Sequence, residues 1–259
     1  MYCLRRSTSP AVHGPVRRVV AKICSAIFWT LGAQQVGGTP EAKSWIKNLD
    51  PEIIQVPFPD GFHCRDTGFD VFKNGLAKLG IGPERVAGVI SETFQGGGPN
   101  FMPKAYAQAL RRWCHIAGAL LCFDEVQAGF GRTGRQWGFE LYDVVPDLFC
   151  IGKGFSSSMP ISAVIGPAAL LDQYAGYEMT STHAGHPVCC AAALIQFKSE
   201  LPKYLYKNGY DISNFNWKER KKRFRMLFYL TFLLKLKVMV KKRSLICLWE
   251  CQVKRKKVR

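Results

Sequence analysis

The sequence has few acidic residues for its length, and the shortage is confined to its two ends. Its 259 residues include 36 Lys and Arg but only 19 Asp and Glu, a formal net charge of +17. Residues 1–40 contain five basic residues and no acidic one, and residues 203–259 contain 18 basic and three acidic residues. Residues 41–202 hold 13 basic and 16 acidic residues and are close to neutral. The basic character therefore belongs to the ends and not to the part that resembles a globular domain.

The sequence also lacks metal-binding cysteine patterns and a long apolar run. None of the ten cysteines forms a Cys-x-x-Cys pair, and no Cys/His set has zinc-like spacing, so we expect reduced intracellular thiols and no bound metal. The apolar run near the C-terminal end, Met226–Val240, has 15 residues and contains Lys235 and Lys237. It is too short and too charged to span a bilayer, so we expect no transmembrane segment.

The two basic ends are open to more than one interpretation. Residues 1–40 have the Arg and Ser content of an organelle transit peptide, although an arbitrary leader has the same composition. Residues 201–259 have the charge to bind nucleic acid or an anionic membrane, but they contain no recognised module and also fit an unstructured end. We expect a leader (1–40), a globular domain (41–200) and a basic tail (201–259), in a cytoplasmic or mitochondrial protein without specific nucleic-acid binding.

The middle of the chain has a strand–helix–strand pattern. Arg85–Ser91 is an apolar strand ending at Glu92, and Ala119–Phe123 is a second one ending at Asp124. Between them, the residues from Pro103 to Gly118 place their apolar side chains on one helical face. Strands joined in this way are parallel, so both acids should lie at the carboxyl edge of one sheet. We expect an α/β fold in which helices cover a mostly parallel sheet that is incomplete at one edge.

A lysine follows the next strand. Leu148–Ile151 is apolar and leads directly into Gly152-Lys153-Gly154. The ligand sites of open α/β sheets lie at the carboxyl ends of their strands. An acid and a lysine at this edge match the needs of a pyridoxal-phosphate enzyme. Such an enzyme uses a lysine to form a Schiff base and a carboxylate to keep the pyridine nitrogen protonated.

The flanking residues resemble the class III aminotransferases, a family of fold-type I pyridoxal-phosphate enzymes. The resemblance covers roughly residues 50–195, and its motifs occur in the family's order: ISETFQGG (90–97), DEVQAGFGRTG (124–134), VVPDLFCIGKG (144–154), MPISAVIG (159–166) and STHAGHPVCCAAAL (181–194). It implies the large domain of the fold, pyridoxal 5'-phosphate as cofactor and a homodimer. It also implies transfer of an amino group between an amino acid or amine and a 2-oxo acid.

The resemblance gives roles to three residues around the predicted strand ends. Lys153 would form the Schiff base and move a proton during the reaction. Asp124 would pair with the protonated pyridine nitrogen, and Gln127 would face the cofactor's O3′ oxygen.

Three other residues receive roles from the same resemblance. Thr182 would bind the cofactor phosphate across the dimer interface, and Ser181 would lie beside it at the substrate. Glu92 would line the site near Asp124. A structural role for Glu92, as a partner for the region around Arg132, is the alternative.

The sequence also departs from the family pattern. The family's N-terminal phosphate loop and its C-terminal small domain, which carries a substrate-binding arginine, find no match, so the chain reads as truncated at both ends. Ser156-Ser157-Ser158-Met159 replaces a Gly-rich loop, and side chains there could strain a turn that favours glycine. Two alternatives to an active aminotransferase follow. One is an inactive fragment that at most pairs with a full-length homologue, and the other is an amino-acid epimerase.

Overall fold

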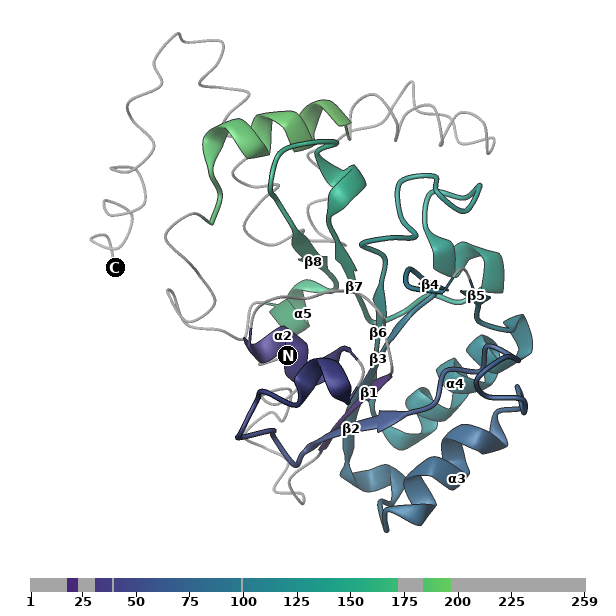
Figure 1. The fold of residues 1–259 in the computed structure, drawn as a ribbon. Helices are drawn as coiled ribbons and strands as arrows, with labels where there is room; N and C mark the ends of the chain where they lie inside the picture. The colour runs from purple at the N-terminus through teal and green to yellow at the C-terminus, as the bar shows by residue number, and fades with distance from the viewer. Residues whose placement is uncertain (1–17, 23–30, 39, 99, 172–183, 197–259) are drawn as a thin grey trace, which may run out of the picture.

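The protein is organised around a six-stranded sheet with strand order β2-β1-β3-β6-β7-β8 (Figure 1). The computed structural model describes residues 18–22, 31–38, 40–98, 100–171 and 184–196. Neighbouring strands are parallel from β2 to β7, and β8 is antiparallel to β7. The strands are β1 (Arg18–Lys22), β2 (Ile53–Val56), β3 (Val86–Glu92), β6 (Leu120–Asp124), β7 (Leu148–Ile151) and β8 (Ala163–Ile165). The mostly parallel α/β sheet predicted from the sequence is confirmed.

Helices lie on both sides of the sheet. Figure 1 shows α3 (Asp70–Lys78) and α4 (Lys104–Ala117) on one side, and α2 (Leu31–Val36) and α5 (Ala168–Leu171) on the other. A further helix covers residues 187–196. The remaining elements are short: η1 (Glu41–Lys43), η2 (Pro83–Arg85), β4 (Phe94–Gln95), β5 (Asn100–Phe101), η3 (Gly138–Tyr142) and η4 (Lys153–Phe155).

Helix α4 follows its sequence pattern closely. Its buried side chains, Tyr106, Ala107, Leu110 and Cys114, recur at the spacing of one helical face. Gly118 ends the helix with φ of 65°, and its N–H donates to the last turn. This left-handed conformation favours glycine at the end of a helix. The helix therefore begins and ends where the sequence predicts.

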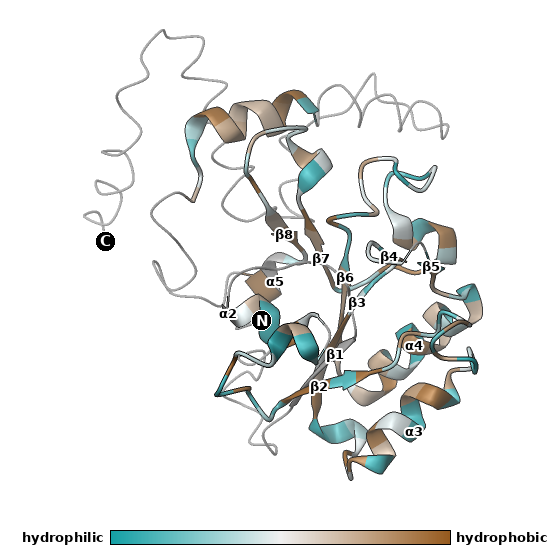
Figure 2. Ribbon diagram, in the orientation of Figure 1, coloured by the Kyte–Doolittle hydropathy of each residue, from teal (hydrophilic) through white to brown (hydrophobic). Residues whose placement is uncertain are grey.

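The core lies mainly between the sheet and the two longer helices. Val89 of β3 and Leu121 and Phe123 of β6 pack in one cluster with α3 and α4. A smaller cluster, built on Ala87, Cys122 and Leu148, lies on the other face of the sheet. The brown colour of β7 and β8 in Figure 2 reflects how apolar these strands are. None of the described helices is long and apolar enough to cross a membrane.

Strand β1 lies inside the stretch that the sequence assigned to a leader. It pairs with β2 on one side and with β3 on the other, so the sheet begins before residue 41. The composition of residues 1–40 obscured this strand, because its apolar centre is short and is flanked by Arg and Lys. The basic tail 201–259 lies outside the described residues.

Asp147 connects α4, β6 and β7. Its Oδ2 accepts hydrogen bonds from Arg111 Nη1 on α4 and from the Leu121 N–H on β6, both at 2.7 Å. The Asp147 N–H in turn donates to the Leu121 carbonyl at 2.9 Å. A carboxylate that accepts from a guanidinium and an amide forms charge-assisted bonds, which are stronger than neutral ones. Asp147 thus fixes where β7 starts against β6.

Replacing Asp147 with Ala should lower the free energy of unfolding by about 2 kcal/mol, because both bonds are lost and the half-buried Arg111 keeps its charge. The control is Lys104→Ala, which removes the ion pair with Asp143. Both side chains of that pair are more than half exposed, so its loss should cost less than about 1 kcal/mol. Urea unfolding of the two variants measures the difference, and equal losses would contradict the role given to Asp147.

Candidate active site

The ends of β3, β6 and β7 bring the predicted site residues to one edge of the sheet. Glu92 and Asp124 are direct partners in the pairing of β3 with β6, and Asp124 is paired with Cys150 of β7. Lys153 follows two residues after the end of β7 and begins η4. The parallel direction of these strands is the reason that residues 92, 124 and 153 meet at their carboxyl ends.

Asp124 is a buried carboxylate with few internal partners. Its side chain is 2% exposed, and its Oδ1 accepts a hydrogen bond from the Val126 N–H at 2.9 Å. Burial raises the pKa of Asp124 to about 6, against the opposing effects of the Val126 hydrogen bond and the positive charge of Lys153. The group is therefore mainly ionised at neutral pH, and a cation placed against it would offset the cost of its burial.

Lys153 points toward the loop that follows β6. Its Nζ donates to Gln127 Oε1, which joins two of the predicted cofactor residues. The backbone of Lys153 has φ of 44°, a left-handed conformation that is costly for a residue with a side chain. Strain of this kind persists where the surrounding structure holds a residue in place, and it is common at functional sites.

The loop after the lysine has the strain that the sequence suggested. Ser157, in the stretch that replaces a Gly-rich loop, has φ of 65°. Its hydroxyl donates to Gln196 Oε1 at 3.2 Å, and the Ser156 hydroxyl donates to the Met159 carbonyl. The serine side chains therefore make hydrogen bonds that glycine could not make, in a turn that favours glycine.

Glu92 lies beside Gln127 because of a tight turn at Gly96. Both oxygens of the Glu92 carboxylate face the Gly96 N–H at 3.4 Å. A Cβ atom on Gly96 would lie 3.2 Å from Gln127 Cγ and 3.5 Å from Glu92 Oε1, so only glycine fits here without displacement. The alternative role of Glu92 was that of a structural partner for the region around Arg132. In the structure Glu92 is buried, whereas Arg132 is exposed. Glu92, Asp124, Gln127 and Lys153 are thus brought together.

Glu125 is a buried acid that the sequence reading missed. Because it follows Asp124 directly at the end of β6, its side chain leaves the strand on the opposite side. It is fully buried and accepts hydrogen bonds from Thr93 Oγ1 at 2.7 Å and from the N–H groups of Gly138 at 2.6 Å and Phe139 at 3.1 Å. The sequence contained one signal for this role, because Glu125 is a second acid directly after an apolar strand and precedes a Gly-rich segment.

Glu125 holds the segment around η3 against the sheet. A Cβ on Gly138 would clash with Thr93 Oγ1 and lie 2.9 Å from Ala128 Cβ, so the close approach of this backbone requires glycine. Burial raises the pKa of Glu125 to about 7, although its three donors favour the ionised form. The folded protein therefore binds this proton more tightly than the unfolded chain does.

Stability should consequently depend on pH through Glu125. The ordinary pKa of Glu is about 4.3, and one pKa unit corresponds to about 1.4 kcal/mol, so Glu125 accounts for a fall of roughly 3 kcal/mol in the free energy of unfolding as the pH rises to about 7. In Glu125→Gln, the fall between pH 5 and pH 8 should be smaller than in the wild type by about 1 kcal/mol or more. Urea unfolding at both pH values measures it. If the free energy of unfolding falls equally in the wild type and in Glu125→Gln, Glu125 is not the source of the pH dependence. Glu84→Gln, at an exposed glutamate, is the matched control and should behave like the wild type.

Two predicted site residues are not among those that the structure describes. Thr182 and Ser181, expected at the cofactor phosphate and the substrate, are outside the described residues. Among the residues that the structure describes, no group of three or more His, Cys, Asp or Glu could hold a metal ion. The six described cysteines are free thiols, and Cys122 and Cys150 have their sulfurs 3.9 Å apart between β6 and β7.

The described residues fit one half of a pyridoxal-phosphate site. A ring whose nitrogen is protonated would find a buried anion in Asp124. An aldehyde would find the amine of Lys153, and a phenolic oxygen would find the amide of Gln127. The fit rests on the pairing of a buried acid with an exposed lysine at one sheet edge.

Known proteins resemble this chain in sequence. A family model for class-III aminotransferases matches residues 30–215. A probable 4-aminobutyrate aminotransferase from Bacillus subtilis is 38% identical over 153 residues, which are 56% of this chain and 35% of that protein. An isoleucine 2-epimerase from Lentilactobacillus buchneri is 34% identical over 177 residues, 64% of this chain and 39% of that protein.

Solved structures show the same architecture. An amine transaminase from an uncultivated Pseudomonas species, in its pyridoxal-phosphate-bound form, superposes with a TM-score of 0.61 at 27% identity. The match covers 74% of this chain and 47% of that one. This chain spans less than half the length of each of these three proteins. The sheet is that of the fold-type I transaminases, and the chain belongs to the class-III aminotransferase family of pyridoxal-phosphate-dependent enzymes.

Proposed function

We propose that the protein is a pyridoxal-phosphate-dependent aminotransferase in which Lys153 holds the cofactor and Asp124 anchors its ring nitrogen. One observation carries the proposal. Asp124 is buried at the end of β6 with one backbone donor, and Lys153, whose charge lowers the pKa of that carboxyl, follows the neighbouring parallel strand. An acid and a lysine so placed supply the two protein groups that the chemistry requires.

Each residue has a separate task in the proposed reaction. Pyridoxal phosphate, when bound, supplies an electron sink for the bonds at the substrate's Cα. Lys153 Nζ would take the proton from Cα and deliver it to the C4′ carbon of the cofactor, because an amine can act as a general base and then as a general acid. Asp124 stays ionised and holds the ring nitrogen in its protonated form.

The other residues orient the cofactor and the substrate. Gln127, which accepts a hydrogen bond from Lys153 Nζ, would donate its amide N–H to the phenolic oxygen, and Glu92 would line the site near Asp124. Thr182 binds the phosphate, and Ser181 lies beside the substrate. These last two assignments rest on the motif at residues 181–194.

The substrates and partners follow from the family. The amino donor is an amino acid or an amine, the acceptor is a 2-oxo acid, and the working unit is a homodimer. The composition of residues 1–40, and not the family, is the support for a location in the cytoplasm or the mitochondrion. A relative that matches over 73% of this chain is an acetylornithine aminotransferase, which supports transfer from an amino acid. The isoleucine 2-epimerase relative favours epimerisation as the second candidate activity. An inactive fragment that pairs with a longer homologue is the third.

The role of Lys153 can be tested with the cofactor itself. Adding pyridoxal phosphate to the purified chain should produce a visible absorption band, and borohydride should fix the cofactor covalently on Lys153, as detected by peptide mass spectrometry. Lys153→Ala should lose both signals, whereas the exposed Lys78→Ala should keep them. A folded wild-type chain without a band, or with the label on other lysines only, would refute the assignment.

The role of Asp124 can be tested through the pH dependence of cofactor binding. Because burial raises its pKa to about 6, the carboxyl is largely protonated at pH 5 and ionised at pH 7, so cofactor affinity should rise over this range. Asp124→Asn should bind pyridoxal phosphate about ten to one hundred times more weakly at pH 7, since a charged hydrogen bond contributes about 1.5–3 kcal/mol. The variant should also lose most of the pH dependence.

Fluorescence titration at the two pH values measures both effects, with the unfolding curve of each variant as a control for folding. An equal rise in affinity in the wild type and in Asp124→Asn would assign the pH dependence to another group. Amino-donor assays with and without a 2-oxo acid then separate the two activities, because epimerisation needs no acceptor.

A further inference from the structure

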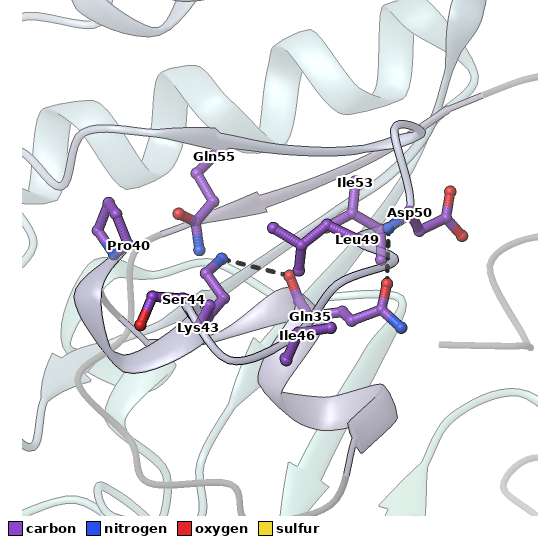
Figure 3. Close-up of a pocket in the computed structure, with 9 residues that line it drawn as sticks. All are labelled: Gln35, Pro40, Lys43, Ser44, Ile46, Leu49, Asp50, Ile53 and Gln55. Atoms are coloured by element: carbon purple, nitrogen blue, oxygen red, sulfur yellow. Dashed lines mark hydrogen bonds between the residues drawn. The ribbon is translucent and has the colours of Figure 1, made fainter.

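A cavity of about 370 Å³ lies between α2, η1 and β2 (Figure 3). Strand β2 is at the opposite end of the sheet from β7 and β8, so this cavity is separate from the Lys153 site. Cavities of roughly 300–1,000 Å³ are large enough for small molecules. Its lining combines one buried cation with several apolar side chains, a combination that indicates the chemistry of an occupant.

The cation is Lys43, at the end of η1. Its side chain is 7% exposed, and its Nζ makes one long hydrogen bond, 3.4 Å to the Gln35 carbonyl. Figure 3 shows the amine pointing into the space between Gln35 and Gln55. An ammonium group has three donors, so within the described part of the chain two of them have no hydrogen-bond acceptor.

Among the described residues, no acid forms an ion pair with Lys43. Burial lowers the pKa of Lys43, with no opposing effect from a carboxylate of the described chain. Asp50 also lines the cavity, but Figure 3 shows its carboxylate turned away from the amine, and its Oδ1 accepts from the Glu52 N–H at 3.0 Å. A buried cation without a counter-charge is costly, and an anion in the cavity would offset that cost.

The rest of the cavity is lined by apolar and polar residues. Pro40, Ile46, Leu49 and Ile53 form an apolar part, so the body of an occupant would meet hydrocarbon there, and the polar lining residues are Gln35, Ser44, Asp50 and Gln55. The side chains of two glutamines fix the surrounding backbone. Gln55 Nε2 donates to the carbonyls of Val36 at 3.2 Å and Gly38 at 3.3 Å, and Gln35 Oε1 accepts from the Asp50 N–H at 2.7 Å.

From this combination we propose that the Lys43 cavity binds a small aliphatic carboxylate. The carboxylate would accept hydrogen bonds from Lys43 Nζ, and the aliphatic chain would contact Ile46, Leu49 and Ile53. A fully hydrophilic anion such as inorganic phosphate would leave these apolar walls without a partner. The site is independent of cofactor binding and of the proposed aminotransferase reaction.

Isothermal titration calorimetry of the full chain with isovalerate tests the proposal. We expect wild-type protein to bind isovalerate, and Lys43→Met to bind it about tenfold more weakly or worse, because Met keeps the length of the side chain and removes its charge. Lys47→Met is the matched control. Lys47 is an exposed lysine four residues along the same segment, so its loss should leave the affinity unchanged.

Two further measurements keep the result decisive if Lys43→Met does not fold. Leu49→Trp places a larger side chain at the exposed rim of the cavity and leaves the amine intact, and it should also weaken binding. The neutral analogue 3-methylbutan-1-ol should bind the wild type about tenfold more weakly than isovalerate does. No binding of isovalerate to the wild type, equal affinities for the acid and the alcohol, or unchanged affinity in both variants would overturn the proposal.

Discussion

The structure depends on how it compensates two carboxylates that are buried next to each other at the end of β6. Asp124 and Glu125 are adjacent, so their side chains leave the strand on opposite sides. Glu125 is compensated internally, by one hydroxyl and two backbone N–H groups. Asp124 has the Val126 N–H and the nearby charge of Lys153, which leaves room for an external cation. One acid therefore stabilises the fold, and the other is available for a ligand.

Two glycines near these carboxylates allow close approaches of the backbone. Gly138 lets the backbone approach Glu125 closely enough to donate to it, and Gly96 lets the turn after Glu92 pass beside Gln127. A Cβ on Gly138 would clash with Thr93, which donates to Glu125, and a Cβ on Gly96 would press against Gln127. The same loops that compensate the buried charges therefore set the position of the groups that face the site. Lys153 itself has a left-handed backbone conformation, with φ of 44°.

Much of the central fold could be predicted from the sequence, because its signals are local. Two apolar strands, ending at Glu92 and Asp124, are joined by the amphipathic helix α4, and this pattern predicts that the strands are parallel. Parallel pairing brings both acids to one edge of the sheet. Other features depend on contacts that no local pattern encodes. β1 was hidden within a basic stretch, the donors of Glu125 lie 13 to 32 residues away, and the burial of Lys43 results from the packing of η1 beside β2. Thr182 and Ser181 remain predictions.

The parallel sheet has a consequence for how the chain folds. Neighbouring strands β3 and β6 meet through residues 32 positions apart, Glu92 and Asp124, and the Asp147 bonds bridge separations of 26 and 36. The pairs β3–β6 and β6–β7 cannot form as local hairpins, because parallel pairing requires a crossover. The entropy of closing each crossover must be lost before its contacts form, which makes folding of such a sheet slow. Until β7 has paired with β6, the chain exposes apolar strand edges, and the lysine and the acid of the site are still apart.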